Sequence, residues 1–587
     1  MLKTLYNLIG EFKRATLIAP IFTALEVVMG VLIPYVTAAI IDKGIMAGDI
    51  QRIYYYGAIM VGLALISLYA GITSGKYSAY AATGFAYNLR DAMYKHVQTF
   101  SFSNIDKFST AGLITRMTTD VSNLQNAFQQ IIRVMVRAPL MLISCFSMSV
   151  FINAKLSLIF VSAMIILGVL LFLIVSRTMK LFSQVFQRYD DLNSSVQENI
   201  AGIRVVKSFV RESYEKKKFS KAATNLYNLF VKAESLLAFN NPVMNLVVYG
   251  CIILLSWFGA KLIVADELTT GELTSLLAYV MNISMSLMML SMIFVMLTMS
   301  TASAKRIFEV LSEKPSIMNP EHPVMEVTDG EISFEHVSFA YENGTGENAL
   351  NDISLHIKSG ETIGIIGGTG SGKSSLVNLI SRLYDVKDGV LRVGGRDVRS
   401  YDLETLRNSV SVVLQKNILF SGTILDNLRW GKEDATEEEC REACRIACAD
   451  EFIEQFPQGY HTRIEQGGTN VSGGQKQRLC LARALLKKPK ILILDDSTSA
   501  VDTATDAKIR TAFASAIPNT TKLIISQRIL SMQNADRILV LDHGQVSGFD
   551  THANLLRTNQ IYQEIYRMQT ESSDGDFDES KEGGVTA

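Results

Sequence analysis

Long apolar runs fill the first half of the chain, whereas the second half mixes short apolar strands with polar and helical segments. A helix needs about 20 mostly apolar residues to cross the hydrocarbon core of a bilayer. Six stretches before residue 300 reach or approach this length, so the pattern predicts six membrane-spanning helices. The expected spans are 15–41, 54–75, 138–152, 156–176, 239–264 and 274–298.

The connections between these spans alternate between short and long. The two long ones, after the second and fourth spans, carry an excess of Lys and Arg, which predicts that both connections and both chain ends lie in the cytoplasm. They contain few helix breakers, so each is expected to form two helices that extend the spans and are joined by a turn. About 25 helical residues would reach roughly 40 Å below the membrane. Residues 1–14 predict a short amphipathic helix at the membrane surface.

Several side chains within the spans are candidates for a substrate site. Glu26 lies in the middle of the first span, where an acid either serves a site or makes a helix-to-helix hydrogen bond. The third span continues backward past Arg133 and Arg137, which are expected near the cytoplasmic interface or in a wet cavity. A row of methionines shares one face of the last span, which indicates either a permissive substrate cavity or soft packing between helices. The row comprises Met281, Met285, Met288, Met292, Met296 and Met299.

The composition fits a membrane protein with a soluble part, because 48% of the residues are hydrophobic and 19% are charged. The net charge of −1 provides no field that would attract nucleic acid. The 6 cysteines do not form the framework of a secreted disulfide protein. Cys440, Cys444 and Cys448 follow a helical spacing, for which small residues on one face of a cytosolic helix are a better interpretation than a metal site.

The second half contains a phosphate-binding motif in the expected context. The letters "GGTGSGKSS" fit G-x-x-x-x-G-K-[ST], after an apolar strand and before a helix-like run. Backbone N–H groups and the helix N-terminus would hold the phosphates of ATP, and Lys373 would reach the β- and γ-phosphates. Ser374 and Asp495, at the end of "ILILD", would ligate Mg²⁺. The expected phosphate-binding residues are Gly367, Gly368, Thr369, Gly370, Ser371, Gly372, Lys373, Ser374 and Ser375. Upstream, Tyr341 either stacks on adenine or belongs to the core.

Further motifs resemble those of ATP-binding-cassette (ABC) proteins. "VSGGQ" resembles the signature, "VVLQKNILFSGTILDNL" the Q-loop with Gln415, and "STSAVD" the D-loop ending at Asp502. The six-span half, with "FSTAGLITRMTTDV" and "VQENIAGIRVVKSF", resembles the membrane domain of bacterial exporter-type half-transporters. The resemblance covers nearly the whole chain. It implies a six-helix membrane domain with long intracellular helices, followed by an α/β nucleotide-binding domain that takes ATP and Mg²⁺, with Gln415 beside the metal.

The resemblance also implies that two subunits sandwich two ATP molecules. Each ATP site would combine the phosphate loop of one subunit with the signature of the other. The residues expected to contact the partner's ATP are Ser472, Gly473, Gly474, Gln475 and Asp502. Before the signature, "IEQGG" differs from the Gly-Glu-Arg-Gly common in the family, so either Glu465 or Gln466 is expected to couple to the membrane helices.

Two positions depart from the active pattern of the family. The acid after Asp495 is usually Glu, which orients the attacking water, but here it is the shorter Asp496. A misplacement of 1 Å can cost on the order of 10²-fold in rate. Gln527 stands where the family has a switch histidine, and Gln can donate a hydrogen bond to a phosphate but cannot become a cation. Together they predict a site that binds ATP and hydrolyses it slowly.

The intact signature, beside this impaired site, resembles the degenerate-site subunit of heterodimeric multidrug exporters. The partner subunit would supply the Glu and the His, and the complex would extrude small hydrophobic or amphipathic compounds across the bacterial inner membrane. A lipid flippase and an ATP-gated regulatory or channel-like subunit are the alternatives. The expected organisation is an interfacial helix (1–14), a membrane domain (15–305), a linker (306–330), a nucleotide-binding domain (331–569) and a disordered acidic tail (570–587).

Overall fold

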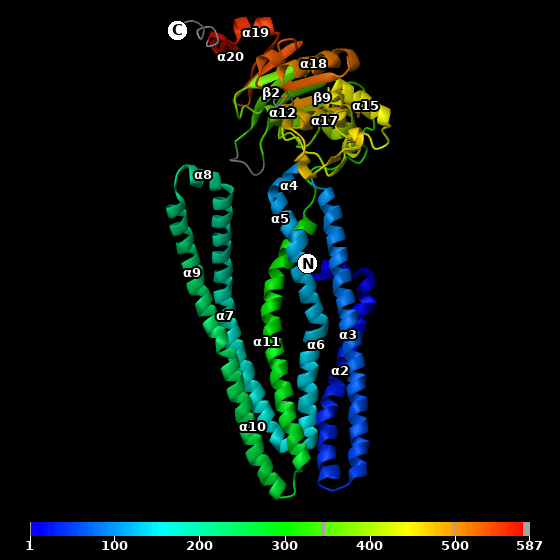
Figure 1. The fold of residues 1–587 in the computed structure, drawn as a ribbon, viewed down its shortest axis with the longest axis vertical. Coiled ribbons are helices and arrows are strands. Elements are labelled where there is room, and N and C mark those ends of the chain that lie inside the picture. The colour runs from blue at the N-terminus through cyan, green and yellow to red at the C-terminus, as the bar shows by residue number, and fades with distance from the viewer. Residues whose placement is uncertain (1, 342–346, 497–500, 579–587) are drawn as a thin grey trace, which may run out of the picture. The chain divides into compact units, whose positions relative to one another are not determined.

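The computed structural model describes residues 2–341, 347–496 and 501–578 and divides the chain into two compact units. The helical unit comprises Met1–Gln98 and Ala111–Glu313. The sheet unit comprises Thr99–Thr110 and Lys314–Ala587 (Figure 1). A short piece of the first long connection therefore belongs to the sheet unit rather than to the helices on either side of it.

The helical unit contains six helices that are long and apolar enough to cross a membrane, as the hydrophobic pattern predicts. Helices suit this role because they satisfy every backbone polar group internally. The helices of this unit begin with α1 (Leu2–Asn7), which lies within the expected interfacial segment, and α2 (Lys13–Ile40), which starts at the end of that segment. The others are α3 (Ile50–Gln98), α5 (Thr110–Thr115), α6 (Val121–Ile152), α7 (Ala154–Ala201), α8 (Ile203–Ser208), α9 (Glu212–Ala238), α10 (Asn240–Val264) and α11 (Thr270–Ser312).

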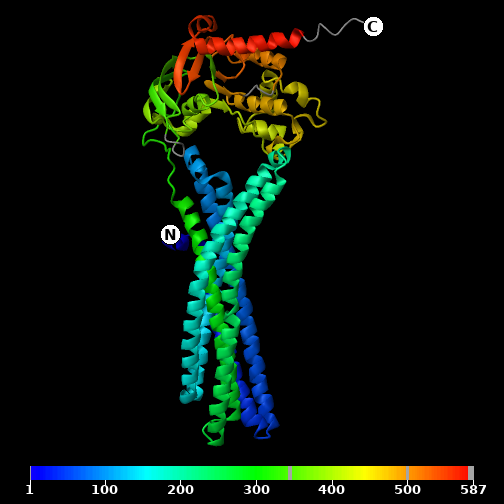
Figure 2. The same cartoon turned by 90° about the vertical axis from the view of Figure 1, so that its left-hand side faces the viewer.

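Both long connections form pairs of extended helices, which confirms that part of the prediction. α3 runs for 49 residues and α7 for 48, so each continues well past its apolar stretch. α7 and α9 lie side by side in both views, and Val185, Leu226 and Ala233 are buried between them (Figures 1 and 2). The turns also contain short helices that the pattern did not predict, namely α4 (Phe102–Phe108) and α8.

A buried cluster joins five of the long helices in the helical unit. Val31 of α2, Cys145 of α6, Phe160 of α7, Leu255 of α10 and Tyr279 of α11 all belong to it. The Tyr279 hydroxyl donates a 2.9 Å hydrogen bond to the Val31 carbonyl. A polar group buried among apolar side chains is costly unless it is paired, so this bond lets a tyrosine pack at the centre of the cluster.

The sheet unit is built around a six-stranded sheet with the order β12-β11-β3-β10-β9-β6. Its strands are β3 (Thr362–Gly367), β6 (Val410–Val413), β9 (Ile491–Asp495), β10 (Thr521–Ile525), β11 (Arg537–Asp542) and β12 (Gln545–Asp550). β10 lies parallel between β3 and β9, with Ile525 opposite Asp495 and Ile365. The carboxyl ends of these strands therefore meet at one edge, where open α/β sheets bind ligands.

The remaining strands form a four-stranded antiparallel sheet and a small two-stranded one. The first contains β1 (Ile332–Phe339), β2 (Leu350–Ile357), β4 (Asp388–Val393) and β5 (Arg396–Asp397), and the second β7 (Gly422–Thr423) and β8 (Arg463–Ile464). The helices are α12 (Lys373–Ile380), α13 (Leu403–Ser409), α14 (Ile424–Arg429), α15 (Glu437–Ile446), α16 (Asp450–Ile453), α17 (Gly473–Leu485), α18 (Thr503–Ala516), α19 (His552–Thr558) and α20 (Gln560–Asp578).

Helix α4 is attached to the sheet unit by side-chain contacts. The Asn104 amide donates to the Lys314 carbonyl at 3.1 Å and accepts from the Ser316 N–H at 3.0 Å. The Tyr384 hydroxyl donates to the Asp106 carboxylate at 2.8 Å. These bonds hold α4 both to the start of the linker and to the segment that follows α12.

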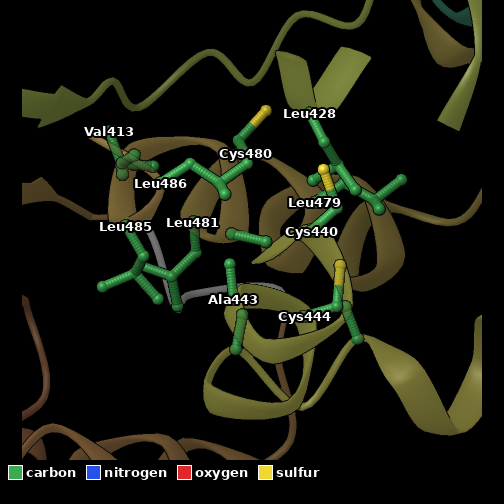
Figure 3. Close-up of a cluster of buried hydrophobic side chains, with 14 of the residues drawn as sticks. Val413, Leu428, Cys440, Ala443, Cys444, Leu479, Cys480, Leu481, Leu485 and Leu486 are labelled. Atoms are coloured by element: carbon green, nitrogen blue, oxygen red, sulfur yellow. The ribbon is translucent and has the colours of Figure 1, made fainter. Parts of the chain in front are cut away.

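Two of the cysteines with helical spacing lie in the core beside α17. Cys440 and Cys444 are fully buried among apolar side chains such as Leu428 and Leu479 (Figure 3). Burial raises the pKa of the Cys444 thiol to about 12, because a thiolate is disfavoured in an apolar surrounding. The interpretation as small packing residues is therefore confirmed for these two, whereas Cys448 is only partly buried.

Two element boundaries differ from the expected domain limits. α11 continues to Ser312, beyond the expected start of the linker at 306, because Arg306 binds Asp120 with an Nε–Oδ2 distance of 2.7 Å and Ile307 is buried. α20 continues to Asp578, so residues 570–578 of the expected disordered tail are helical. Each residue added to an existing helix gains a backbone hydrogen bond without a new nucleation cost, which favours extension from the packed first turns.

Candidate nucleotide site

The phosphate loop lies between β3 and α12, at the carboxyl edge of the main sheet. Gly370 has a φ of 81° and Gly372 a φ of 92°, a region that residues with a Cβ rarely adopt. A Cβ at Gly372 would also lie 2.7 Å from the Ala349 carbonyl oxygen. The glycines of the motif therefore let the loop turn tightly into the N-terminus of α12, whose free N–H groups suit an anion.

Lys373 is held over the phosphate loop by the loop itself. Its Nζ donates to the carbonyl oxygens of Gly367 at 2.9 Å and Gly368 at 2.7 Å. Burial lowers the pKa of Lys373, while the carboxylates of Asp495 and Asp496 act in the opposite direction. The loop thus carries a partly desolvated ammonium facing two acids, and such a charge interacts strongly with phosphate oxygens.

Asp495 and Ser374 meet beside this ammonium. Asp495 ends β9 and is buried, which raises the pKa of its carboxyl, and a side-chain hydrogen bond with Ser374 opposes that rise. A hydroxyl and a carboxylate are hard oxygen ligands of the kind that Mg²⁺ prefers. The pair therefore has the chemistry expected for holding the Mg²⁺ that accompanies a nucleotide.

Asp496 turns sharply out of β9. Its φ of 48° lies in the left-handed region, which Asp tolerates better than most residues, and its N–H donates to the Ile525 carbonyl at 3.0 Å. Burial raises the pKa of the Asp496 carboxyl, and a side-chain hydrogen bond with Gln415 lowers it, as do the charges of Arg528 and Lys373. The shorter acid is thus engaged by the glutamine of the Q-loop.

The segment after β10 carries Gln527, whose side chain is exposed. Its carbonyl accepts a 2.6 Å hydrogen bond from the Gln569 amide, and the Gln569 carbonyl oxygen accepts a 2.9 Å bond from the Ile529 N–H. Gln569 of α20 therefore binds this segment on both sides of Arg528. Sequence reasoning missed Gln569, since nothing local links a residue of the last helix to this segment. The sequence did point to Arg528, because this residue directly follows Gln527, which stands at the position of the switch histidine.

Tyr341 lies next to the start of α12. Its hydroxyl is 2.9 Å from the Ser375 hydroxyl, and its ring contacts the Tyr384 ring edge-on with centroids 5.2 Å apart. The residue is half-buried and also packs against the core of the sheet unit. The structure thus shows the core packing, and stacking of Tyr341 on adenine stays a prediction.

The signature begins α17 with a reciprocal cap. The Ser472 N–H donates to the Gln475 side chain at 2.9 Å, and the Ser472 hydroxyl accepts from the Gln475 N–H at 3.3 Å. Ser472 and Gly473 remain exposed. Asp502 caps α18 by accepting from the Thr505 N–H at 2.9 Å, whereas the D-loop positions 497–500 lie outside the described residues. Within the described ranges, no hydrogen bond joins the signature to the phosphate loop.

The two candidates for the coupling role before the signature differ in their contacts. The Glu465 carboxylate accepts a 2.9 Å hydrogen bond from the Thr469 hydroxyl, so it is used within its own loop. Gln466 is exposed in a short 3₁₀ turn. Which of them couples to the membrane helices stays a prediction.

The intramembrane candidates in the helical unit differ in their surroundings. Glu26 accepts a 2.8 Å hydrogen bond from Arg137, so α2 and α6 are joined by an ion pair. The methionine row is divided, because Met281 and Met292 are 48% and 75% exposed while Met288 packs against Leu167 and its neighbours. The Met299 side chain lies outside the described structure. The helix-to-helix alternative thus fits Glu26, and the soft-packing alternative fits Met288.

Comparisons with known proteins cover both units. Residues 16–288 match the family model described as ABC transporter transmembrane region, and residues 350–499 match the one described as ABC transporter. An uncharacterized ABC transporter ATP-binding protein of Bacillus subtilis, YfiB, is 38% identical over 94% of this chain and 96% of its own length. An ATP-dependent lipid A-core flippase of Hahella chejuensis is 31% identical over 94% of this chain and 95% of its own. A solved bacterial Atm1-family ABC exporter with ATP bound shares the fold, with a TM-score of 0.82 at 22% identity over 95% of this chain and 99% of its own.

Proposed function

Because this chain belongs to the ABC transporter family and has the domain order of an exporter half-transporter, we propose that it is one subunit of a heterodimeric exporter. In this proposal the complex lies in a bacterial inner membrane, with the nucleotide-binding domains in the cytoplasm. It extrudes hydrophobic or amphipathic compounds of the multidrug type. This subunit binds ATP at its own phosphate loop, hydrolyses it slowly, and completes the faster site of its partner.

The observation that carries the proposal is the environment of Asp496. Its carboxylate is shorter than a glutamate and is already hydrogen-bonded to Gln415, so it has less reach toward a water beside the γ-phosphate. Gln527 cannot supply a cation to that phosphate in place of histidine. Both departures affect the hydrolysis step, because the acid at position 496 orients the attacking water and the side chain at position 527 stabilises the charge of the transition state.

Binding needs none of the missing groups. Lys373 would exchange the carbonyls of Gly367 and Gly368 for phosphate oxygens, and the N-terminus of α12 would contact the same anion. Ser374 and Asp495 would hold the Mg²⁺, which supplies charge neutralisation between the phosphates when it is bound. The site therefore has what tight binding requires and lacks what fast hydrolysis requires.

The exposed signature supports the need for a partner. Ser472 and Gly473 present the N-terminus of a 13-residue helix to their surroundings, and that end attracts an anion. A homodimer would pair this signature with two slow sites. A partner that carries the Glu and the His would give the complex one fast site.

Lipid translocation is a second candidate, favoured by the 31% identity to a protein named as a lipid A-core flippase. The exposed methionines of α11 suit either cargo, because methionine adapts to many apolar shapes. An ATP-gated regulatory or channel-like subunit differs from both candidates in one respect, since its ATPase activity would not respond to a transported compound.

The test compares ATPase activity in lipid nanodiscs for the chain alone and for the chain with the partner that copurifies with it. We expect the lone chain to be at least about 10-fold slower than the complex. The double variant Asp496→Glu and Gln527→His should raise the rate of the lone chain by about 10-fold or more, since one misplaced group can cost on the order of 10². Fast turnover by the unmodified lone chain would contradict the proposal. A complex whose activity ignores both drug-like compounds and lipids would favour the gating alternative.

A further inference from the structure

A pocket of about 510 Å³ lies in the sheet unit, away from the phosphate loop. It is lined by residues of α18 and β10, by the segment 530–535 and by Thr362 at the start of β3. The phosphate loop follows the other end of β3, one strand length away, which is roughly 20 Å for six residues. The pocket has a size typical of small-molecule sites and shares no lining residue with the nucleotide site.

Lys522 is the unusual member of the pocket lining. It lies on β10, is 5% exposed, and faces the same side of the sheet as Ile524. Its Nζ donates to the Thr520 carbonyl at 2.8 Å, which is the one acceptor that the described ranges provide for its three N–H donors. A buried ammonium with unused donors is costly unless a counter-charge joins it.

The other charged groups near the pocket do not supply that counter-charge. Arg510 is paired with Asp506 at 3.1 Å and also donates to the Leu530 carbonyl, so it is already satisfied. Asp536 accepts from the Thr362 N–H at 2.8 Å and makes no ion pair with Lys522 within 4 Å among the described residues. Burial lowers the pKa of Lys522, and the more distant charge of Asp536 opposes that change.

The rest of the lining is mixed. Leu530 is 58% exposed and offers apolar surface, whereas Thr511, Gln533 and Asn534 offer groups that can hydrogen-bond. One unsatisfied cation matches a single negative charge, and the nearby carboxylate of Asp536 disfavours a dianion. The chemistry therefore describes a small molecule with one carboxylate and a partly apolar, partly hydrogen-bonding body.

We propose that this pocket binds a small amphipathic monocarboxylate whose anion pairs with Lys522. The lining segment 530–535 directly follows the segment that contains Gln527, and its Ser531 N–H donates a 3.1 Å hydrogen bond to the Arg528 carbonyl. This site does not depend on the heterodimer proposal, since every lining residue belongs to this chain and none is a residue of the phosphate loop or of the Mg²⁺-binding pair.

The test uses 2-naphthoate as the probe and calorimetry of the full-length chain in nanodiscs, with empty nanodiscs subtracted. We expect saturable binding to the unmodified chain. Lys522→Met keeps the length of the side chain but removes its charge, so the Kd should rise at least about 10-fold, as expected for loss of a charge-assisted hydrogen bond. Lys487→Met is the matched control, because the pKa of Lys487 is also lowered by burial, its Nζ also donates to a backbone carbonyl, and it does not line the pocket. Its Kd should not change.

A second variant keeps the proposal testable if Lys522→Met fails to fold. Leu530 is 58% exposed, so Leu530→Glu should fold and should weaken binding of the anion by repulsion. The neutral analogue 2-acetylnaphthalene should bind the unmodified chain at least about 10-fold more weakly than the carboxylate. Absent binding, equal affinity for the neutral analogue, or an unchanged Kd in both variants would overturn the proposal.

Discussion

The phosphate loop and the signature of this chain lie in the same sheet unit but present their groups in opposite ways. The phosphate loop satisfies itself, since Lys373 binds the loop carbonyls, and beside it Asp496 is hydrogen-bonded to Gln415. The signature satisfies its backbone through the Ser472 cap but leaves Ser472 and Gly473 exposed. The difference indicates that the phosphate loop is arranged to retain a ligand and the signature to contact a separate surface.

The largest effect is expected from a change in the exposed signature. Gly474→Asp places a negative side chain in the first turn of α17, where the proposal has the partner's γ-phosphate. We expect turnover of the complex to fall about 10²-fold or more, similar to the loss of a key electrostatic group in other enzymes. ATP binding by the lone chain should be unchanged, and measuring it with a fluorescent ATP analogue provides the control. Equal loss of binding in the lone chain would mean that both half-sites serve one nucleotide.

A smaller effect is expected from the matching change in the phosphate loop. Lys373→Met removes the ammonium that is held over the loop, so the affinity of this site for ATP should fall about 10-fold or more. Part of the turnover of the complex should remain, because the proposal assigns hydrolysis mainly to the other site. Steady-state ATPase measurements check this. A loss of turnover as severe as that caused by removing the partner's catalytic Glu would contradict the assignment of hydrolysis to the other site.

A modest effect is expected from Gln569→Ala, which removes two hydrogen bonds between α20 and the segment around Arg528. Net hydrogen bonds contribute about 0.5–1.5 kcal/mol each, so the segment should open more often rather than unfold. We expect faster amide hydrogen exchange at residues 527–530 and a change of about 2- to 5-fold in the ATPase rate. Gln563→Ala on the same helix is a suitable control, because its amide binds Leu556 and not this segment.

The smallest expected effect is on how thermal stability depends on pH. The pKa of Asp496 is raised by burial, so folding favours its neutral form, and the charged form above that pKa costs stability. Asp496→Asn keeps the shape and also tolerates the left-handed backbone, so it should melt about 1–2 °C higher than the unmodified chain at neutral pH. The difference should shrink as the pH falls through the pKa of the carboxyl. A difference that stays constant with pH would point to a cause other than ionisation.

The sequence predicted the features that depend on local pattern. Apolar length located the six long helices, and the glycine-rich motif located the turn between β3 and α12. It did not predict the Glu26–Arg137 ion pair or the Gln569 bonds, because each joins residues that are distant along the chain. The pattern also placed the end of α11 too early, since the Arg306–Asp120 pair that extends it is a tertiary contact.

Helix α4 has a mechanical consequence for the chain. Since α4 is bound to Lys314, Ser316 and Tyr384, the polypeptide enters the sheet unit before Ser101, leaves it near Thr110 and enters it again after Glu313. The polypeptide chain therefore crosses between the two units three times. A protease cut within residues 318–326 would leave α4, Lys314 and Ser316 on the fragment that carries the helical unit, so non-covalent contacts such as the Tyr384–Asp106 hydrogen bond would have to hold the two fragments together on a sizing column.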